Sequence, residues 1–281
     1  MIWSNYHGHS HYCDGKGAIE EYIQEALKQG METIGISSHA PLPFETLWAM
    51  PQERINEYIN EIVLLKKKYE GIIQVYTGLE VDFIPDMIGP EHDSIKQLLL
   101  DYNVGSVHYV DQFPDGTHFE ADGSRQGFVK AIDEIFEGNI QKLVKRYFEL
   151  VRMMLKTSTP TILGHLDKIK IQNTDGVLFD ENAAWYRDEM MHTLEVLSAS
   201  GIIMEVNTRG LYKKKCDATY PSLWVLKEAF KLGIPVTINS DAHHPRELTG
   251  NFEYAASEVK AAGYRVTSHL WNGKWEEKPL G

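Results

Sequence analysis

Residues 2–9 read IWSNYHGH, a short run that ends in two histidines separated by one glycine. Short runs with apolar residues, bounded by turn residues, are typical of strands in a parallel sheet. Six further runs of this kind follow, and most of them end at or just before a histidine or an acidic residue. The predicted strands are Ile2–His7, Thr33–Ser38, Ile73–Glu80, Val104–His108, Thr161–His165, Ile202–Asn207 and Pro235–Ser240.

Helical patterns lie between most of these strands. The predicted helices are Ala18–Gln29, Pro51–Lys68, Glu91–Asp101, Arg125–Phe136, Asn139–Thr157, Asn182–Ser200, Tyr220–Leu232 and Phe252–Ala261. Gly30, Gly201 and Gly233 each follow a helix, where a left-handed residue commonly ends it. Alternating strands and helices predict a parallel sheet with crossover helices. Seven strands predict an α/β barrel with one strand fewer than the common eight, and an open doubly wound sheet is the alternative.

Length and composition limit the class of protein. The chain has 281 residues and a net charge of −12, so we expect a single domain over residues 1–281 that does not bind nucleic acid through a basic surface. Cys13 and Cys216 are too few for a disulfide framework, and the first residues lack the features of a signal peptide. No run reaches the roughly 18–20 apolar residues of a membrane span. We therefore expect a cytoplasmic protein without membrane contact.

Polar residues with metal-binding side chains gather at the ends of the predicted strands. In parallel α/β folds these carboxyl ends face one common crevice. A single histidine after a strand is usually a hydrogen-bonded loop residue, but imidazoles and carboxylates gathered without a cation would leave many polar groups unsatisfied. The set therefore predicts a cluster of Zn²⁺, Mn²⁺ or Fe ions. Its members are His7, His9, His39, Glu80, His108, His165, Asp241 and His243.

Two local spacings support this interpretation. His7 and His9 are two residues apart, as are Asp241 and His243, and residues at this spacing on an extended strand point to the same side. Each pair could therefore reach one ion. The H-x-H pair also occurs in amidohydrolase barrels, but these generally use a lysine where Glu80 stands here.

Taken together, these motifs resemble the polymerase-and-histidinol-phosphatase (PHP) superfamily, and more closely its monofunctional histidinol-phosphatases. The helix-rich stretch 125–155 also resembles an insertion in the latter group. The resemblance implies a distorted seven-stranded (β/α) barrel of the PHP type with a trinuclear metal site. The resembling stretches are Tyr6–Gly15 (YHGHSHYCDG), Ile36–His39 (ISSH), Gly78–Phe83 (GLEVDF), Gly105–Val110 (GSVHYV), Gly164–Lys170 (GHLDKIK), Glu205–Gly210 (EVNTRG) and Asn239–His243 (NSDAH).

The resemblance also implies how the ligands are shared among two or three divalent ions. Glu80 would bridge the first two ions. Either Asp14 or His11 would complete the third, and Asp14 is the one chosen here. The implied sets are His7, His9, Glu80 and Asp241 for the first ion, Glu80, His108 and His165 for the second, and His39, His243 and Asp14 for the third.

The expected reaction is hydrolysis of L-histidinol phosphate to L-histidinol and phosphate, in histidine biosynthesis, by a metal-activated hydroxide. Asp241 or His243 could protonate the leaving alkoxide. Arg209 and Lys170 are expected substrate contacts, since cationic groups bind phosphate, and Ser10, which sits beside metal ligands, is the third. The alternatives are a PHP phosphoesterase for nucleotides or other phosphomonoesters and a catalytically silent PHP module.

The irregular stretch 111–124 follows a strand end and is predicted to be a loop that covers the site. Its acidic residues could bind the amine of histidinol phosphate, and Phe113 or Phe119 could cover the imidazole. The sequence leaves the metal and the oligomeric state open. The acidic residues of this loop are Asp111, Asp115, Glu120 and Asp122.

Overall fold

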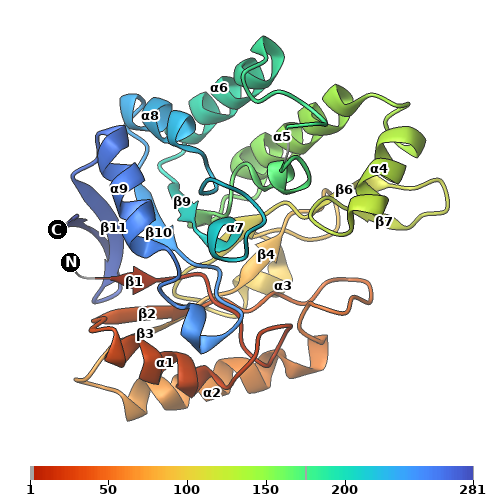
Figure 1. Cartoon of the computed structure of the whole chain (residues 1–281). Helices are drawn as coiled ribbons and strands as arrows, with labels where there is room; N and C mark the ends of the chain where they lie inside the picture. Colours follow the sequence, from red (N-terminus) through yellow and green to blue (C-terminus); the bar gives the residue numbers. More distant parts are fainter. Residues whose placement is uncertain (1–2, 175, 281) are drawn as a thin grey trace.

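A computed structural model describes residues 3–174 and 176–280, so Ile2 of the first predicted strand lies outside the described residues. Two parallel sheets form the centre of the molecule (Figure 1). The first contains, in order, β1 (Ser4–Asn5), β2 (Thr33–Ile36) and β3 (Gln74–Thr77). The second contains, in order, β10 (Val236–Asn239), β9 (Ile203–Asn207), β8 (Ile162–Leu163), β5 (Val104–Ser106) and β4 (Glu80–Asp82).

Two single parallel bridges join these sheets into a closed ring. His39 pairs with Glu80 on one side, and Gly8 pairs with Ala242 on the other. The predicted strand Ile73–Glu80 is the one that crosses from sheet to sheet, as β3 and then β4. The prediction of a distorted seven-stranded α/β barrel is therefore confirmed, and each of the seven predicted strands contributes to it.

The ring of Tyr102 packs against glycines in β2 and between β3 and β4. A side-chain carbon added at Gly78 would lie 2.4 Å from the ring of Tyr102, and one added at Gly35 of β2 would lie 2.2 Å from its hydroxyl. The Tyr102 hydroxyl donates a hydrogen bond of 2.8 Å to the carbonyl of Tyr6. Glycine is needed at both positions because the buried phenol ring occupies the space of a side chain.

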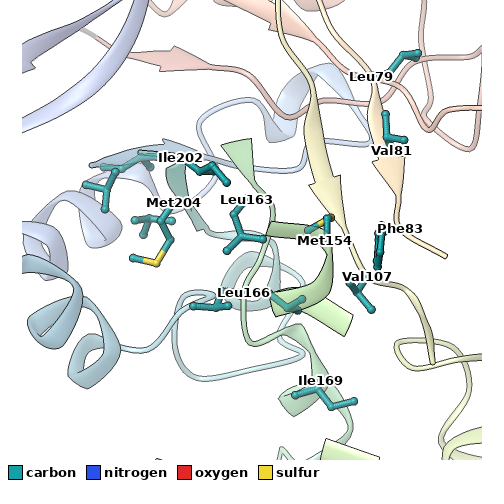
Figure 2. Packing of buried hydrophobic residues seen from close by; sticks show 14 of the residues in the cluster. Leu79, Val81, Phe83, Val107, Met154, Leu163, Leu166, Ile169, Ile202 and Met204 are labelled. Atoms are coloured by element: carbon teal, nitrogen blue, oxygen red, sulfur yellow. The ribbon is translucent and has the colours of Figure 1, made fainter. Parts of the chain in front are cut away.

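Helices cover both sheets. The helices α1 (Ile19–Lys28) and α2 (Ile55–Lys68) lie against the first sheet (Figure 1). Over the second sheet and its end lie α5 (Ile140–Thr157), α6 (Ala184–Ser198), α8 (Leu223–Lys231) and α9 (Phe252–Ala262). Leu163 and Met204 are register partners on β8 and β9, and they share one apolar cluster with Met154 of α5 (Figure 2). Burying such side chains stabilises the fold by about 1.5–3 kcal/mol each. Among the described residues, no helix is long and apolar enough to span a bilayer.

Several elements differ from the prediction. Helix Glu91–Asp101 is only one turn, α3 (Asp93–Lys96), and α8 begins at Leu223 because the backbone of Tyr220 pairs with that of Asn207. The stretch 111–124, predicted as an irregular loop, contains most of a hairpin, β6 (Tyr109–Gln112) and β7 (His118–Glu120), while α4 (Arg125–Glu134) follows it where a helix was predicted. The remaining short helices are η1 (Gln52–Arg54), η2 (Lys168–Gln172), α7 (Arg209–Tyr212) and η3 (Pro245–Glu247).

A C-terminal hairpin that was not predicted, β11 (Val266–Trp271) and β12 (Lys274–Pro279), closes the amino end of the barrel. The backbone N–H of Leu270 donates a 2.8 Å hydrogen bond to the Tyr6 hydroxyl, and the rings of Tyr6 and Trp275 meet edge to face at 5.0 Å. Leu270 also belongs to the apolar cluster inside this end. Because the hairpin seals the amino end, the carboxyl ends of the strands form the face available to a ligand.

His269 on β11 ties the stability of this hairpin to pH. Only 6% of the residue is exposed, and its Nε2 lies 3.0 Å from the Thr267 hydroxyl. Burial, with a smaller effect of Lys278, lowers the pKa of His269 from 6.5 to about 4. Below pH 6.5 the unfolded chain therefore takes up a proton here while the folded chain does not. The free energy of unfolding falls as the pH drops through this window.

Between pH 7 and pH 5, the metal-free wild type is expected to lose about 2 kcal/mol more stability than the His269→Gln variant. Urea unfolding of both proteins at both pH values measures the difference. His192→Gln is the matched control, since His192 lies on the exposed side of α6. Equal pH dependence in wild type and His269→Gln would show that His269 is not the group responsible.

Candidate metal centre

Four buried side chains from both ends of the chain meet at the carboxyl end of the barrel. His7 Nε2 lies 3.1 Å from Glu80 Oε2 and 3.8 Å from Asp241 Oδ1. His9 Nε2 lies 3.4 Å and 3.1 Å from the same two oxygens. None of the four residues is more than 2% exposed. The predicted convergence of the first and last strands is therefore present.

Glu80 lies at the centre of this arrangement. Its Oε1 is 3.0 Å from His165 Nε2 and 3.6 Å from His108 Nε2. Its Oε2 is 3.0 Å from His39 Nδ1, in addition to the contacts with His7 and His9. One carboxylate thus touches imidazoles from four other strand ends, as a bridging ligand would.

A second group forms at the mouth of the barrel. Asp14 Oδ2 lies 3.2 Å from His243 Nε2, and Asp14 Oδ1 lies 3.9 Å from His39 Nε2. His11, the competing first-loop residue, is exposed and packs its ring against Tyr12. The geometry therefore favours Asp14 over His11 as the first-loop ligand.

Three sets of ligand atoms, each lying within 4.8 Å of one another, could each hold a cation. His9 belongs to two of these sets, whereas the resemblance to the PHP superfamily implied that it binds the first ion alone. His108 belongs to none of the three sets among the described residues. The sets are His7, His9 and Asp241; His7, Glu80 and His165; and His9, Asp14, His39 and His243.

Unsatisfied nitrogens show that a cation suits this cluster. The Nε2 atoms of His7 and His9 and the Nδ1 atom of His39 are buried without a hydrogen-bond partner among the described residues. Leaving such atoms unpaired is costly, and coordination to a cation would relieve the cost. Lys168 Nζ lies 3.3 Å from His108 Nε2 and 3.4 Å from His165 Nε2, so a positive charge already faces these two imidazoles.

For His9 and Glu80, electrostatics favours the protonation states that metal ligands need, whereas at His7 and His108 the neighbouring carboxylates outweigh burial and raise the pKa, for His108 to about 9. Burial and the neighbouring His243 and His39 lower the pKa of His9 well below its usual value, so its lone pair is free at neutral pH. Burial alone would raise the pKa of Glu80, but the surrounding histidines hold it well below the usual range. Glu80 is therefore ionised and His9 is neutral.

Two carboxylates that the sequence analysis missed orient the imidazoles. Glu205 Oε1 accepts a 2.7 Å hydrogen bond from His7 Nδ1, and Asp82 Oδ1 accepts a 2.9 Å bond from His108 Nδ1. Since a carboxylate only accepts, each bond keeps the proton on Nδ1 and leaves Nε2 free to face the cluster. The signal for Asp82 was its position two residues after Glu80, on the same side of β4.

A cavity of about 340 Å³ opens onto the cluster. Four cationic side chains line it, and two of them, Arg209 and Lys168, contact cluster residues; the other two are Lys213 and Lys215. Arg209 Nη1 donates hydrogen bonds of 2.7 Å to His243 Nδ1 and 2.8 Å to the carbonyl of Asp241, and Lys168 Nζ lies 2.9 Å from Asp122 Oδ2. The cluster residues that line the cavity are Asp14, His39, His108, Asp241 and His243.

Lys170 and Ser10, the other two predicted substrate contacts, lie away from the cavity. Lys170 is 2% exposed, and its ammonium donates to Asp167 Oδ2 at 2.7 Å and to the carbonyl of Thr219 at 3.0 Å. Ser10 is fully buried, with its hydroxyl 2.9 Å from that of Ser38. Neither residue lines the cavity. Residues two apart on a 3₁₀ helix point to different sides, so on η2 Lys168 faces the cavity and Lys170 does not.

Comparison with known proteins identifies the family of the chain. The PHP domain family matches residues 5–209, and Asp241 and His243 lie beyond the matched segment. A Deinococcus radiodurans protein named "Probable histidinol-phosphatase" is 30% identical over 269 residues, 93% of this chain and 94% of that protein. The histidinol-phosphatase of Bacillus subtilis is 28% identical over 266 residues, 88% of this chain and 96% of that protein.

A solved structure has the same fold. Histidinol phosphate phosphatase from Lactococcus lactis, complexed with Zn, L-histidinol and phosphate, superimposes with a TM-score of 0.73 at 21% identity, over 98% of each chain. Since the family match covers most of the chain and the relatives align over nearly their whole length, this protein belongs to the PHP domain family.

Proposed function

We propose that the protein hydrolyses L-histidinol phosphate to L-histidinol and inorganic phosphate. The observation that carries this proposal is the buried cluster around Glu80, which opens into a cavity lined by cationic side chains, Arg209 and Lys168 among them. The names of relatives that align along nearly the whole chain point to the same substrate.

The ligand sets described above suit two or three divalent ions of the Zn²⁺, Mn²⁺ or Fe type, because imidazole and carboxylate are their usual partners. When bound, such ions polarise the phosphoryl group and provide a nucleophile at neutral pH. Glu80 would be shared between neighbouring ions, because both of its oxygens face imidazoles. We assign Asp14, rather than His11, to the third ion, which lies at the mouth of the barrel with His39 and His243.

The chain's own cations would bind the phosphate. The guanidinium of Arg209 has five N–H donors, so donors remain for phosphate oxygens beyond its bonds to His243 and Asp241. Lys168 replaces Lys170 as the second contact, since it lines the cavity beside His108 and His165. The leaving alkoxide needs a proton, and we assign its delivery to Asp241 or His243, which both line the cavity.

The test is a phosphatase assay on protein stripped with a chelator and then reconstituted with Mn²⁺ or Zn²⁺. We expect release of phosphate from L-histidinol phosphate only after reconstitution, with elemental analysis giving two to three ions per chain. The comparison substrates are 3′,5′-nucleotides and 4-nitrophenyl phosphate. Faster turnover of the nucleotides would favour the alternative, a PHP phosphoesterase for other phosphomonoesters, and metal-independent activity would contradict both.

Glu205→Gln tests how His7 is held. Gln keeps the size and one acceptor but removes the charge behind His7 Nδ1, so we expect the affinity for the ions to fall by roughly 10–100-fold. At saturating Mn²⁺, kcat should return to within about threefold of wild type, because Glu205 does not touch substrate. Mn²⁺ titration of the activity measures the affinity. Glu195→Gln, on the exposed side of α6, is the control, and an unchanged Mn²⁺ dependence would contradict the assignment.

A further inference from the structure

One wall of the cavity comes from the end of the β6–β7 hairpin. Glu120 ends β7, pairs in register with Tyr109, and precedes Ala121, whose N–H donates to the carbonyl of His108 at 2.8 Å. The hairpin end therefore lies beside the metal-binding cluster. Of the four acidic residues in stretch 111–124, only Glu120 and Asp122 line the cavity.

The other two acidic residues are engaged elsewhere. Asp111 accepts hydrogen bonds of 2.9–3.1 Å from the guanidinium of Arg146 on α5. Asp115 lies in the exposed turn of the hairpin and accepts a 2.9 Å bond from the N–H of Thr117. Neither is available to a ligand in the cavity.

The two acidic residues that line the cavity differ in whether a positive charge is paired with them. Asp122 pairs with Lys168 at 2.9 Å. The carboxylate of Glu120 has no hydrogen bond or ion pair with any of the described residues, although it is partly buried. Burial and the nearby Asp122 raise the pKa of Glu120. A cation bound beside this carboxylate would offset both causes, the burial and the repulsion from Asp122.

An aromatic surface lies on the same cavity. The Trp48 ring stacks on Tyr109 at 5.9 Å and meets the His39 ring edge-on at 4.4 Å. Phe119, expected to cover an imidazole, is 1% exposed, and Phe113 packs against it at 6.1 Å. Neither phenylalanine lines the cavity. Trp48 and Tyr220 both do, and Trp48 is the less buried of the two, so we take it as the ring that meets a ligand.

We propose that Glu120 binds the ammonium group of the substrate and so selects phosphomonoesters that carry an amine. The phosphate would lie at Arg209 and Lys168 while the amine lies at Glu120, with Trp48 beside the imidazole. Substrate orientation then follows from charge, since a second phosphate or a carboxylate at the amine position would be repelled by Glu120. This inference rests on the proposed phosphatase function, and it names the residue that sets substrate choice.

The experiment compares wild type and Glu120→Gln, both loaded with Mn²⁺, on two substrates that differ only in the amine. These are L-histidinol phosphate and its des-amino analogue, 3-(imidazol-4-yl)propyl phosphate. In Glu120→Gln we expect KM for the amine substrate to rise roughly tenfold, with kcat changed less than about twofold, because the lost contact acts equally in the ground and transition states. The analogue should be hydrolysed equally by both proteins.

Asp115→Asn is the matched control, because it removes one negative charge from the same hairpin outside the cavity and keeps the acceptor for Thr117. It should match wild type on both substrates. Equal losses of Glu120→Gln on both substrates, or no loss on either, would overturn the role of Glu120. Failure of wild type to hydrolyse either imidazole substrate while it hydrolyses 4-nitrophenyl phosphate would instead overturn the proposed function, and the assignment of Glu120 with it.

Discussion

Replacing Glu80 by glutamine is expected to lower the turnover of L-histidinol phosphate by a factor of roughly 10³ or more, about 4 kcal/mol of transition-state stabilisation. Glutamine has the same shape, so the barrel should remain intact. The change removes the one negative charge that contacts His7, His39 and His165 together. It also places an amide N–H₂ against imidazole nitrogens, where a ligand oxygen is needed.

Turnover and metal content of the same preparations measure this effect. We expect Glu80→Gln to hold at least one ion fewer per chain, and excess Mn²⁺ should not restore activity, in contrast to Glu205→Gln. Glu91→Gln is the control, since Glu91 is exposed and belongs neither to the cavity wall nor to the ligand sets. A variant that kept both its ions and its turnover would show that Glu80 is not a bridging ligand.

The convergence of ligands was predictable because it depends on topology alone. Parallel strands with crossover helices bring their carboxyl ends together, so His7 and Asp241 had to meet once both were assigned to strand ends. The exact partners were not predictable in this way. Asp241 adopts a φ of 52°, a left-handed conformation uncommon outside glycine. Only the fold shows that His9 belongs to two ligand sets, the one with His7 and Asp241 and the one with Asp14, His39 and His243.

The C-terminal hairpin was missed although its signal is present. Asn272 and Gly273 both adopt positive φ in the two-residue turn between β11 and β12, and Asn-Gly between short strand-like runs is a strong hairpin signal. The run 274–279 is mostly exposed and charged, so it lacks the apolar alternation that marks a half-buried strand. Asp115 and Gly116 gave the corresponding signal for the β6–β7 hairpin.

Lys170 shows where a motif misleads. The stretch GHLDKIK contains two lysines, and the sequence cannot tell which of them faces the site. The structure buries Lys170 between Asp167, Thr219 and Ser222, so its charge is neutralised inside the protein. Its role is therefore structural: it joins η2 to the segment that precedes α8.

Lys170→Met is expected to lower the free energy of unfolding by about 3–5 kcal/mol, because it leaves the Asp167 carboxylate buried without a counter-charge. Asp167 would retain only the 3.3 Å bond from the N–H of Ser222, and its Oδ1 already lacks a partner among the described residues. Thermal unfolding should show a midpoint lower by roughly 10 °C. Lys231→Met is the control, since its pair with Glu228 is on the surface and contributes at most about 1 kcal/mol.

Kinetics on the same variant separates the two roles of Lys170. At a temperature where Lys170→Met is fully folded, kcat and KM for L-histidinol phosphate should stay within about twofold of wild type, because the side chain does not reach the cavity. Lys168→Met, also compared at a temperature where it is fully folded, should instead raise KM or lower kcat, since Lys168 lines the cavity. A normal unfolding midpoint combined with a tenfold higher KM in Lys170→Met would return the phosphate contact to Lys170, and the orientation of η2 described here would then be wrong.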